Sequence, residues 1–177
     1  MVVDQNFLDV KKYFLLIIFF LLFASKSYSN NFTFTKIIEL DEPWGSSFIN
    51  NNEIIITEKS GKIKIVNVVL KEVLEIKHNL DFLEVGQGGL LDIIHQDGTL
   101  WISYSENRGN SKTSTSIAIA QLNKQELNFN NIFQSNPPID SGYHFGSRLV
   151  IKSDYLYAST GERGQGMIAQ DPTKHPG

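Results

Sequence analysis

The chain contains no cysteine among its 177 residues. This absence excludes disulfide bonds, thiolate metal sites and a cysteine nucleophile. It also excludes the lipid-attachment cysteine of an exported bacterial lipoprotein. Small exported domains often depend on disulfides, so a chain without them needs a substantial hydrophobic core. Hydrophobic residues make up 41% of the sequence, which is enough for such a core and argues against disorder.

An excess of charge of one sign is also missing. The sequence has 16 Lys and Arg against 19 Asp and Glu, for a net charge of −3, and no basic run or stripe occurs. Nucleic acid is therefore not an expected partner. The length is that of a single domain.

The one long apolar run lies near the N-terminus. Lys11 and Lys12 precede an apolar stretch over residues 13–24, and residues 27–29 have the small-x-small pattern of a cleavage site. The run is shorter than the ~20 residues of a membrane-spanning helix. The sequence therefore predicts a signal peptide over 1–29, a mature domain over 30–177 and a periplasmic or secreted location. The alternative is an uncleaved signal anchor, which would be the only membrane contact.

The rest of the chain has the pattern of an all-β fold. Short apolar runs, several of them alternating with period two, are separated by turn-forming residues. Asp97-Gly98 between two such runs is a strong hairpin signal. Residues 69–76 alternate less cleanly and fit a strand or a short helix, of which the neighbouring pattern favours the strand. The expected strands are 35–40, 53–57, 62–65, 69–76, 89–94, 100–104, 116–122, 127–133, 146–151 and 155–159.

These strands fall into repeating units. Trp44-Gly45, Gly88-Gly89 and Phe145-Gly146 each open a unit made of an apolar strand, a tight turn and a second strand. About four strands at a period of roughly 40–60 residues are typical of a β-propeller blade. Glycine suits the innermost strands, where neighbouring blades crowd together. A β-sandwich with coincidental spacing is the alternative.

The number of units predicts an incomplete propeller. Two full blades and the first half of a third fit between residues 35 and 160. Because a propeller closes with at least about four blades, we expect a partial propeller of about two and a half to three blades. Its open side would expose unpaired backbone groups.

His144 is the candidate for chemistry among the four histidines. His78 and His95 lie in or beside strand patterns without an acidic or nucleophilic neighbour, and we expect them to be structural. His144 stands just before the glycine that opens the third unit. A loop residue held by a rigid scaffold is well placed for function.

Three segments occur in order along the chain. They are Val85-Gly86-Gln87-Gly88-Gly89-Leu90-Leu91-Asp92, His144-Phe145-Gly146-Ser147-Arg148-Leu149, and Gly161-Glu162-Arg163-Gly164 with Ala169-Gln170-Asp171. Together they resemble the glucose/sorbosone dehydrogenase family, whose soluble, periplasmic aldose dehydrogenases use pyrroloquinoline quinone (PQQ) on a six-bladed propeller. The resemblance covers essentially all of residues 37–177 but only the N-terminal half of the family's length.

The resemblance implies oxidation of the C1 hydroxyl of an aldose sugar, with PQQ as hydride acceptor and calcium as a second cofactor. It implies His144 as the catalytic base, since an imidazole titrates in a suitable range. Gln87 would be a polar group beside substrate and quinone. Arg148 would either face the anionic cofactor or hold a loop. Glu162 is either a polar site residue or an exposed turn charge, and Asp171 is similar.

Two departures from the family pattern limit these expectations. Tyr143 stands where the best-known branch has an acid that orients the histidine, so the group that orients His144 is unassigned. The family's PQQ-gripping basic residues and calcium-binding segment belong to later blades. We therefore expect this chain alone to be inactive. The alternative is a non-catalytic secreted propeller that acts as a binding module. The electron acceptor is not indicated.

Overall fold

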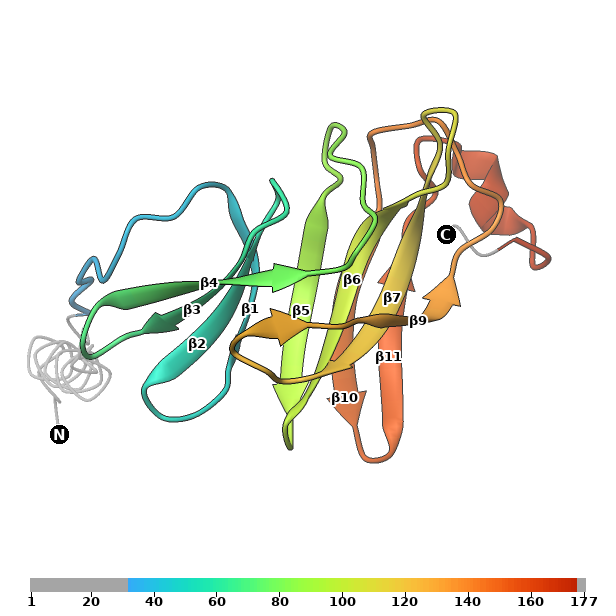
Figure 1. The fold of residues 1–177 in the computed structure, drawn as a ribbon. Coiled ribbons are helices and arrows are strands. Elements are labelled where there is room, and N and C mark those ends of the chain that lie inside the picture. The colour runs from blue at the N-terminus through green and yellow to red at the C-terminus, as the bar shows by residue number, and fades with distance from the viewer. Residues whose placement is uncertain (1–31, 175–177) are drawn as a thin grey trace, which may run out of the picture. The chain divides into compact units, whose positions relative to one another are not determined.

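The computed structural model describes residues 32–174. The chain divides into residues 1–35 and 36–177, and the fold below is that of the second unit. The predicted signal peptide over 1–29 lies outside the described residues. Within the described part, no helix has the length and apolar character needed to cross a membrane. Figure 1 shows strands throughout the second unit, with a short 3-10 helix, η1 (Gly166–Gln170), near its end.

The first sheet is built from consecutive antiparallel strands. These are β1 (Pro43–Phe48), β2 (Glu53–Glu58), β3 (Ile63–Asn67) and β4 (Glu72–His78). The strand predicted over 35–40 is wrong, because that segment has no regular structure and β1 already occupies the edge of β2. The strand predicted over 69–76 is present but begins at Glu72, after a turn.

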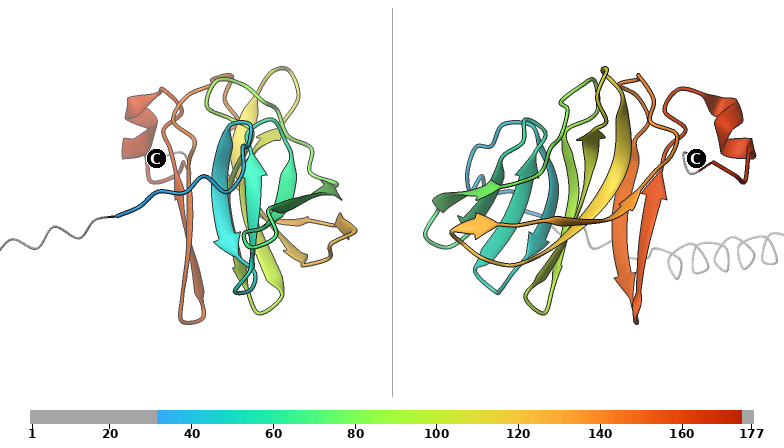
Figure 2. Two further views of the ribbon diagram at one scale, coloured as in Figure 1. Left: turned by 90° about the vertical axis from the view of Figure 1, so that its left-hand side faces the viewer. Right: turned by 45° about the vertical axis from the view of Figure 1, so that its right-hand side comes forward.

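The second sheet repeats this arrangement. It contains β5 (Leu90–Gln96), β6 (Thr99–Asn107), β7 (Thr113–Gln121) and β9 (Asn130–Gln134), again antiparallel. The Asp97-Gly98 hairpin joins β5 and β6 as predicted, with both residues at positive φ. The third sheet has two strands, β10 (Gly146–Lys152) and β11 (Tyr155–Thr160). Figure 2 shows the three sheets side by side, with the third at the C-terminal end of the row.

The first strands of the three sheets pack in a row, with β5 in contact with both β1 and β10. Each of the three has a register shift near its beginning. Gly45 lies at the shift in β1, and a Cβ there would stand 2.6 Å from the carbonyl oxygen of Leu91 in β5. Only glycine therefore allows this close approach between the two strands.

Hydroxyl groups join each sheet to the next at these shifts. The Thr57 Oγ1 of β2 accepts a hydrogen bond from the Gly45 N–H at 2.9 Å and donates to the Leu91 carbonyl at 2.5 Å. Ser103 of β6 repeats the arrangement one sheet later. It accepts from the Asp92 N–H at 3.0 Å and donates to the Ser147 carbonyl of β10 at 2.7 Å.

The main core lies between the first and second sheets. Isoleucines of β2, β3 and β4 meet apolar side chains of β5, β6 and β7, and their alternation along each strand is what the sequence pattern predicted. The buried members are Ile55, Ile63, Ile65, Ile76, Leu90, Ile93, Leu100, Ile102, Tyr104, Ala118, Ala120, Leu127 and Phe129.

Residues 122–129, called the strap below, leave the second sheet and run back to the first. Within the strap, β8 (Glu126–Leu127) pairs in parallel with β4. Leu127 is fully buried, and Asn79 binds both the N–H of Phe129, at 2.7 Å, and its carbonyl, at 3.1 Å. The single strand predicted over 127–133 is thus two strands in two different sheets.

Candidate functional site

His144 lies in the loop that leads into β10. Its φ is +50°, a left-handed conformation that a residue with a side chain adopts at a cost in energy and that often marks a functional position. The side chain is 56% exposed. The sequence placed His144 just before the third unit, and the structure agrees.

Gln87, in the loop that leads into β5, fixes the backbone of the His144 loop. Its N–H donates to the Gly142 carbonyl at 2.7 Å, and its side-chain oxygen accepts from the His144 N–H at 2.9 Å. Gly86 and Gly142 touch backbone to backbone, since a Cβ on Gly86 would lie 2.4 Å from the Gly142 oxygen. The two predicted site residues are therefore directly bonded, although 57 residues separate them.

Glu162 orients the His144 ring. Its carboxylate Oε1 is hydrogen-bonded to His144 Nδ1. This contact answers the question the sequence left open, because Glu162, and not the residue before His144, is the orienting acid. A carboxylate at Nδ1 places the ring proton on that nitrogen, so Nε2 carries the free lone pair. The ring is thereby set up to accept a proton at Nε2.

The same contact acts on the acid. The hydrogen bond from His144 is the largest cause that lowers the pKa of Glu162 below its ordinary value, and the charge of His144 adds to it. Glu162 is therefore ionised at neutral pH.

Arg163 supports the backbone of the loop before His144, a role that sequence reasoning missed. The residue is 2% exposed. Its guanidinium lies 3.6 Å from the centroid of the Phe145 ring and donates to the Tyr143 carbonyl at 3.0 Å. Further donors reach the Ser141 carbonyl and, at 2.6 Å, the hydroxyl of Thr113. Burial lowers the pKa of Arg163 to about 10, which leaves it charged at neutral pH.

Arg148 is held by the neighbouring sheet. Its Nη1 lies 3.2 Å from both carboxylate oxygens of Asp92 in β5, and that carboxylate also accepts the Leu149 N–H at 2.8 Å. Asp92 is buried, whereas the Arg148 side chain is 74% exposed. The pair joins the first strands of two sheets, so Arg148 has a structural role here. Much of its guanidinium nevertheless remains open to solvent.

The remaining candidates have local roles. His78 Nε2 lies 2.7 Å from the Gly61 carbonyl, and His95 Nε2 accepts the Gly98 N–H at 3.1 Å, so both stabilise turns. Asp171 accepts from the backbone and hydroxyl of Thr173 in an exposed turn. Among residues 32–174, no group of three or more His, Cys, Asp and Glu side chains could hold a metal ion.

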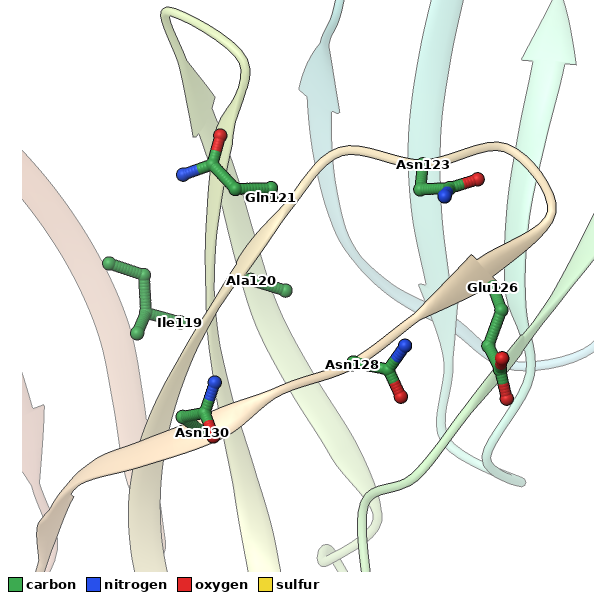
Figure 3. Close-up of a pocket in the computed structure, with 7 residues that line it drawn as sticks. All are labelled: Ile119, Ala120, Gln121, Asn123, Glu126, Asn128 and Asn130. Carbon is green, nitrogen blue, oxygen red and sulfur yellow. The ribbon is translucent and has the colours of Figure 1, made fainter.

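A separate hollow of about 360 Å³ lies between β7 and the strap and contains none of the predicted site residues (Figure 3). Amide side chains surround an apolar floor there. The lining residues are Ile119, Ala120, Gln121, Asn123, Glu126, Asn128 and Asn130.

Successive sheets joined at their first strands, with an exposed histidine and its carboxylate at one of these strands, define a β-propeller protein with a polar site beside its inner strands. The family model described as Glucose / Sorbosone dehydrogenase matches residues 40–177. The chain belongs to this family, and its predicted all-β, propeller-family fold is confirmed. The β-sandwich alternative is wrong.

Individual relatives agree with this assignment. The chain is 31% identical over 149 residues to the aldose sugar dehydrogenase YliI of Escherichia coli, an alignment that covers 78% of this chain and 40% of that protein. The apo crystal structure of the soluble E. coli aldose sugar dehydrogenase superposes with a TM-score of 0.73 at 32% identity, over 78% of this chain and 43% of the other. The chain thus spans less than half the length of these relatives.

A more distant structure shows the same fold. The PQQ-bound aldose sugar dehydrogenase of Streptomyces coelicolor superposes with a TM-score of 0.65 at 21% identity. The match again covers 78% of this chain and 43% of the other.

Proposed function

We propose that this chain supplies the catalytic base of a PQQ-dependent aldose sugar dehydrogenase that oxidises the C1 hydroxyl of the sugar. The observation that carries the proposal is the His144–Glu162 pair, which leaves Nε2 free on an exposed ring. Membership of the glucose/sorbosone dehydrogenase family supports the substrate class.

The reaction converts the C1 hemiacetal to a lactone by removing a hydride from C1 and a proton from its hydroxyl. His144 accepts the proton at Nε2, and Glu162 stabilises the resulting imidazolium. Gln87 holds the backbone of His144 through its side-chain oxygen. Its amide nitrogen makes no hydrogen bond within residues 32–174, so it can donate to a sugar hydroxyl or a quinone oxygen.

Among the residues present, the exposed Arg148 guanidinium fits a carboxylate of an anionic quinone. PQQ, when bound, accepts the hydride. The exposed face of the Arg148 guanidinium would pair with a cofactor carboxylate, while its Nη1 stays on Asp92. The Streptomyces coelicolor relative, which has the same fold and was solved with PQQ bound, supports PQQ as the cofactor. Calcium remains a proposal that follows from the family resemblance alone.

Export is part of the proposal. The lysines, apolar run and small-x-small pattern of residues 11–29 support a signal peptide, and hence a periplasmic or secreted protein. The electrons of the reduced quinone would then pass to an acceptor outside the cytoplasm.

A dye-coupled assay tests the function. The 177-residue chain and, in parallel, the longest reading frame that contains it are given PQQ, calcium and glucose. We expect no dye reduction by the chain alone. In the longer product, His144→Ala should lower kcat/KM at least about 100-fold, since general base catalysis contributes at least that much. His95→Ala is the control and should leave the rate unchanged.

Two outcomes would contradict the proposal. The assignment fails if the longer product neither binds PQQ nor oxidises any aldose. The expected inactivity of the chain is wrong if the chain alone reduces the dye and loses this activity on His144→Ala. A non-catalytic binding module, the second candidate, requires sugar binding that His144→Ala leaves intact.

A further inference from the structure

The hollow of about 360 Å³ beside the strap is formed by one continuous segment of the chain (Figure 3). Its lining begins at Ile119 in β7, follows the strap and ends at Asn130, where β9 starts. The strands β7 and β9 pair only as far as these two residues. Beyond them the strap leaves β7 to join β4, so the edge of β7 that is opposite β6 faces the hollow instead of a strand.

The alternation of side chains along the strap places polar groups in the hollow. Leu127 and Phe129 are 0% and 5% exposed and belong to the core between the first two sheets. Their neighbours Glu126, Asn128 and Asn130 are exposed and line the hollow, as the period of two in an extended chain requires. The buried contacts of the strap therefore fix which of its side chains face the hollow.

This lining has hydrogen-bonding groups to spare. Within residues 32–174, the side chains of Asn128 and Asn130 make no hydrogen bond. Gln121 uses its side-chain nitrogen, which donates to a threonine hydroxyl of β6 at 3.1 Å, and its side-chain oxygen is left over. Asn123 uses its oxygen, which accepts a backbone N–H at 2.8 Å, and its nitrogen is left over. The hollow thus offers a ligand both donors and acceptors.

The charges around the hollow favour a neutral ligand. Glu126 is the one charged side chain among the seven lining residues, and its carboxylate repels anions. Lys124, the one basic residue of the strap, binds Glu53 of β2 at 2.7 Å instead. A single carboxylate is too few for a metal site, and residues 32–174 contain no cluster of metal-binding side chains. An apolar ligand would cover Ile119 and Ala120 but leave the amides unpaired.

We propose that this hollow binds a neutral carbohydrate, at a site separate from His144. Each sugar hydroxyl both donates and accepts, which matches the free amides of Asn128 and Asn130 on one side and Gln121 on the other. The apolar C–H groups of the ring lie against Ile119. The volume is at the lower end of the range for small-molecule sites, which suits a mono- or disaccharide. Such a site retains a saccharide on the protein without converting it.

A titration of the ¹⁵N-labelled chain with methyl β-glucoside tests the site. The C1 oxygen of this sugar is methylated, so His144 has no C1 hydroxyl to deprotonate, and the test does not rest on the proposed function. The backbone amides of residues 119–130 and the side-chain amides of Asn128 and Asn130 should shift in the NMR spectrum. We expect a dissociation constant of about 1–10 mM, as for a ligand held by a few exposed groups.

Matched variants make the test specific. Asn128→Ala combined with Asn130→Ala should weaken binding at least about 10-fold, because the sugar loses partners on the strap. Gln125→Ala is the control, since this exposed amide belongs to the same strap but does not line the hollow. His144→Ala should leave the shifts of residues 119–130 unchanged, which separates this site from the proposed active site.

A charged sugar tests the role of Glu126. Methyl β-glucuronide differs from the glucoside in carrying a carboxylate. It should bind the wild-type chain several-fold more weakly than the glucoside does, because two carboxylates repel each other. Glu126→Gln removes one of these charges and should bring the two affinities closer together.

Four results would overturn the proposal. They are the absence of shifts over residues 119–130 at about 100 mM glucoside, equal affinity of the double variant and the wild type, tighter binding of the glucuronide, and stronger shifts of the same amides with triglycine, which would assign the hollow to a peptide. The spectrum of each free variant shows whether it keeps the wild-type fold. For a variant that does not, the same substitution in the longest reading frame is tested by saturation transfer to the glucoside.

Discussion

The imidazole of His144 depends on side chains from separate parts of the chain. Gln87 holds its backbone, Glu162 holds its ring, and Arg163 holds the carbonyls of Ser141 and Tyr143 in the same loop. Because Glu162 and Arg163 are adjacent, one short turn after β11 supplies both the acid that orients the base and the cation that supports its loop.

The His144–Glu162 contact predicts a change in acidity. His144→Ala should raise the pKa of Glu162 toward its ordinary value of 4.5, because the largest cause of its lowering is then removed. Carboxyl carbon chemical shifts across a pH titration measure it, with His95→Ala as control. An unchanged Glu162 titration would mean that the pair is not formed in solution.

The sign of the accompanying stability effect follows from the same shift. The pKa of Glu162 is lower in the folded chain than in the unfolded chain, so the pair contributes stability above the unfolded value. That contribution is lost as the pH falls through the folded value. Wild type and His144→Ala should therefore converge in stability at low pH, as acid unfolding would show.

At this scale the sequence identified His144 and Gln87 because they fall in recognisable segments. It could not identify Arg163. An arginine in the turn Gly161-Glu162-Arg163-Gly164 reads as an exposed turn residue, and only the folded loop shows that backbone carbonyls converge on it. It also could not choose between the two roles of Glu162, since the choice depends on where the turn lies in space.

At the scale of elements, the contact between β1 and β5 makes a direct prediction. Gly45→Ala should destabilise the chain by about 1–3 kcal/mol, because the new Cβ would lie 2.6 Å from the Leu91 carbonyl and force the strands apart. Urea unfolding measures this cost. Gly166→Ala is the control, since a Cβ there meets nothing within 4 Å, and its cost should stay below about 0.5 kcal/mol. Equal costs would show that the close approach is absent.

Strands with a regular alternating pattern were predictable, and those that depend on distant partners were not. β2, β3, β5, β6, β10 and β11 lie close to their predicted ranges. Residues 35–40 have strand-like composition but no free partner, so they form none. β8 has two residues and exists only because β4 offers an edge, which the local sequence does not reveal.

At the scale of the whole molecule, the strap joins the first two blades. The chain has one tryptophan in each, Trp44 in β1 and Trp101 in β6, and two in all. Single-tryptophan variants, Trp44→Phe and Trp101→Phe, should therefore report the same urea midpoint in the wild-type background. The shared core and the strap make the two blades unfold together.

Removing the hydrogen bonds that attach the strap to Asn79 should separate the urea midpoints that the two tryptophans report. Asn79→Ala leaves the Phe129 N–H and carbonyl without their partner, which costs about 1–3 kcal/mol. Trp44 should then report a lower midpoint than Trp101. Asn128→Ala, an exposed change within the strap, should keep the two midpoints equal. If Asn79→Ala also keeps them equal, the strap does not couple the blades.

The same strap constrains the order in which the molecule is made. Asn79 meets Phe129 across 50 residues of sequence, so ribosomal synthesis produces all of β1 to β4 well before the segment that covers β4 exists. During that interval the edge of β4 is an open template for pairing with other chains. The nascent protein therefore passes through a stage in which the strands of its first blade are complete but β8 does not yet cover the edge of β4. A chaperone that binds strand edges would act at that stage.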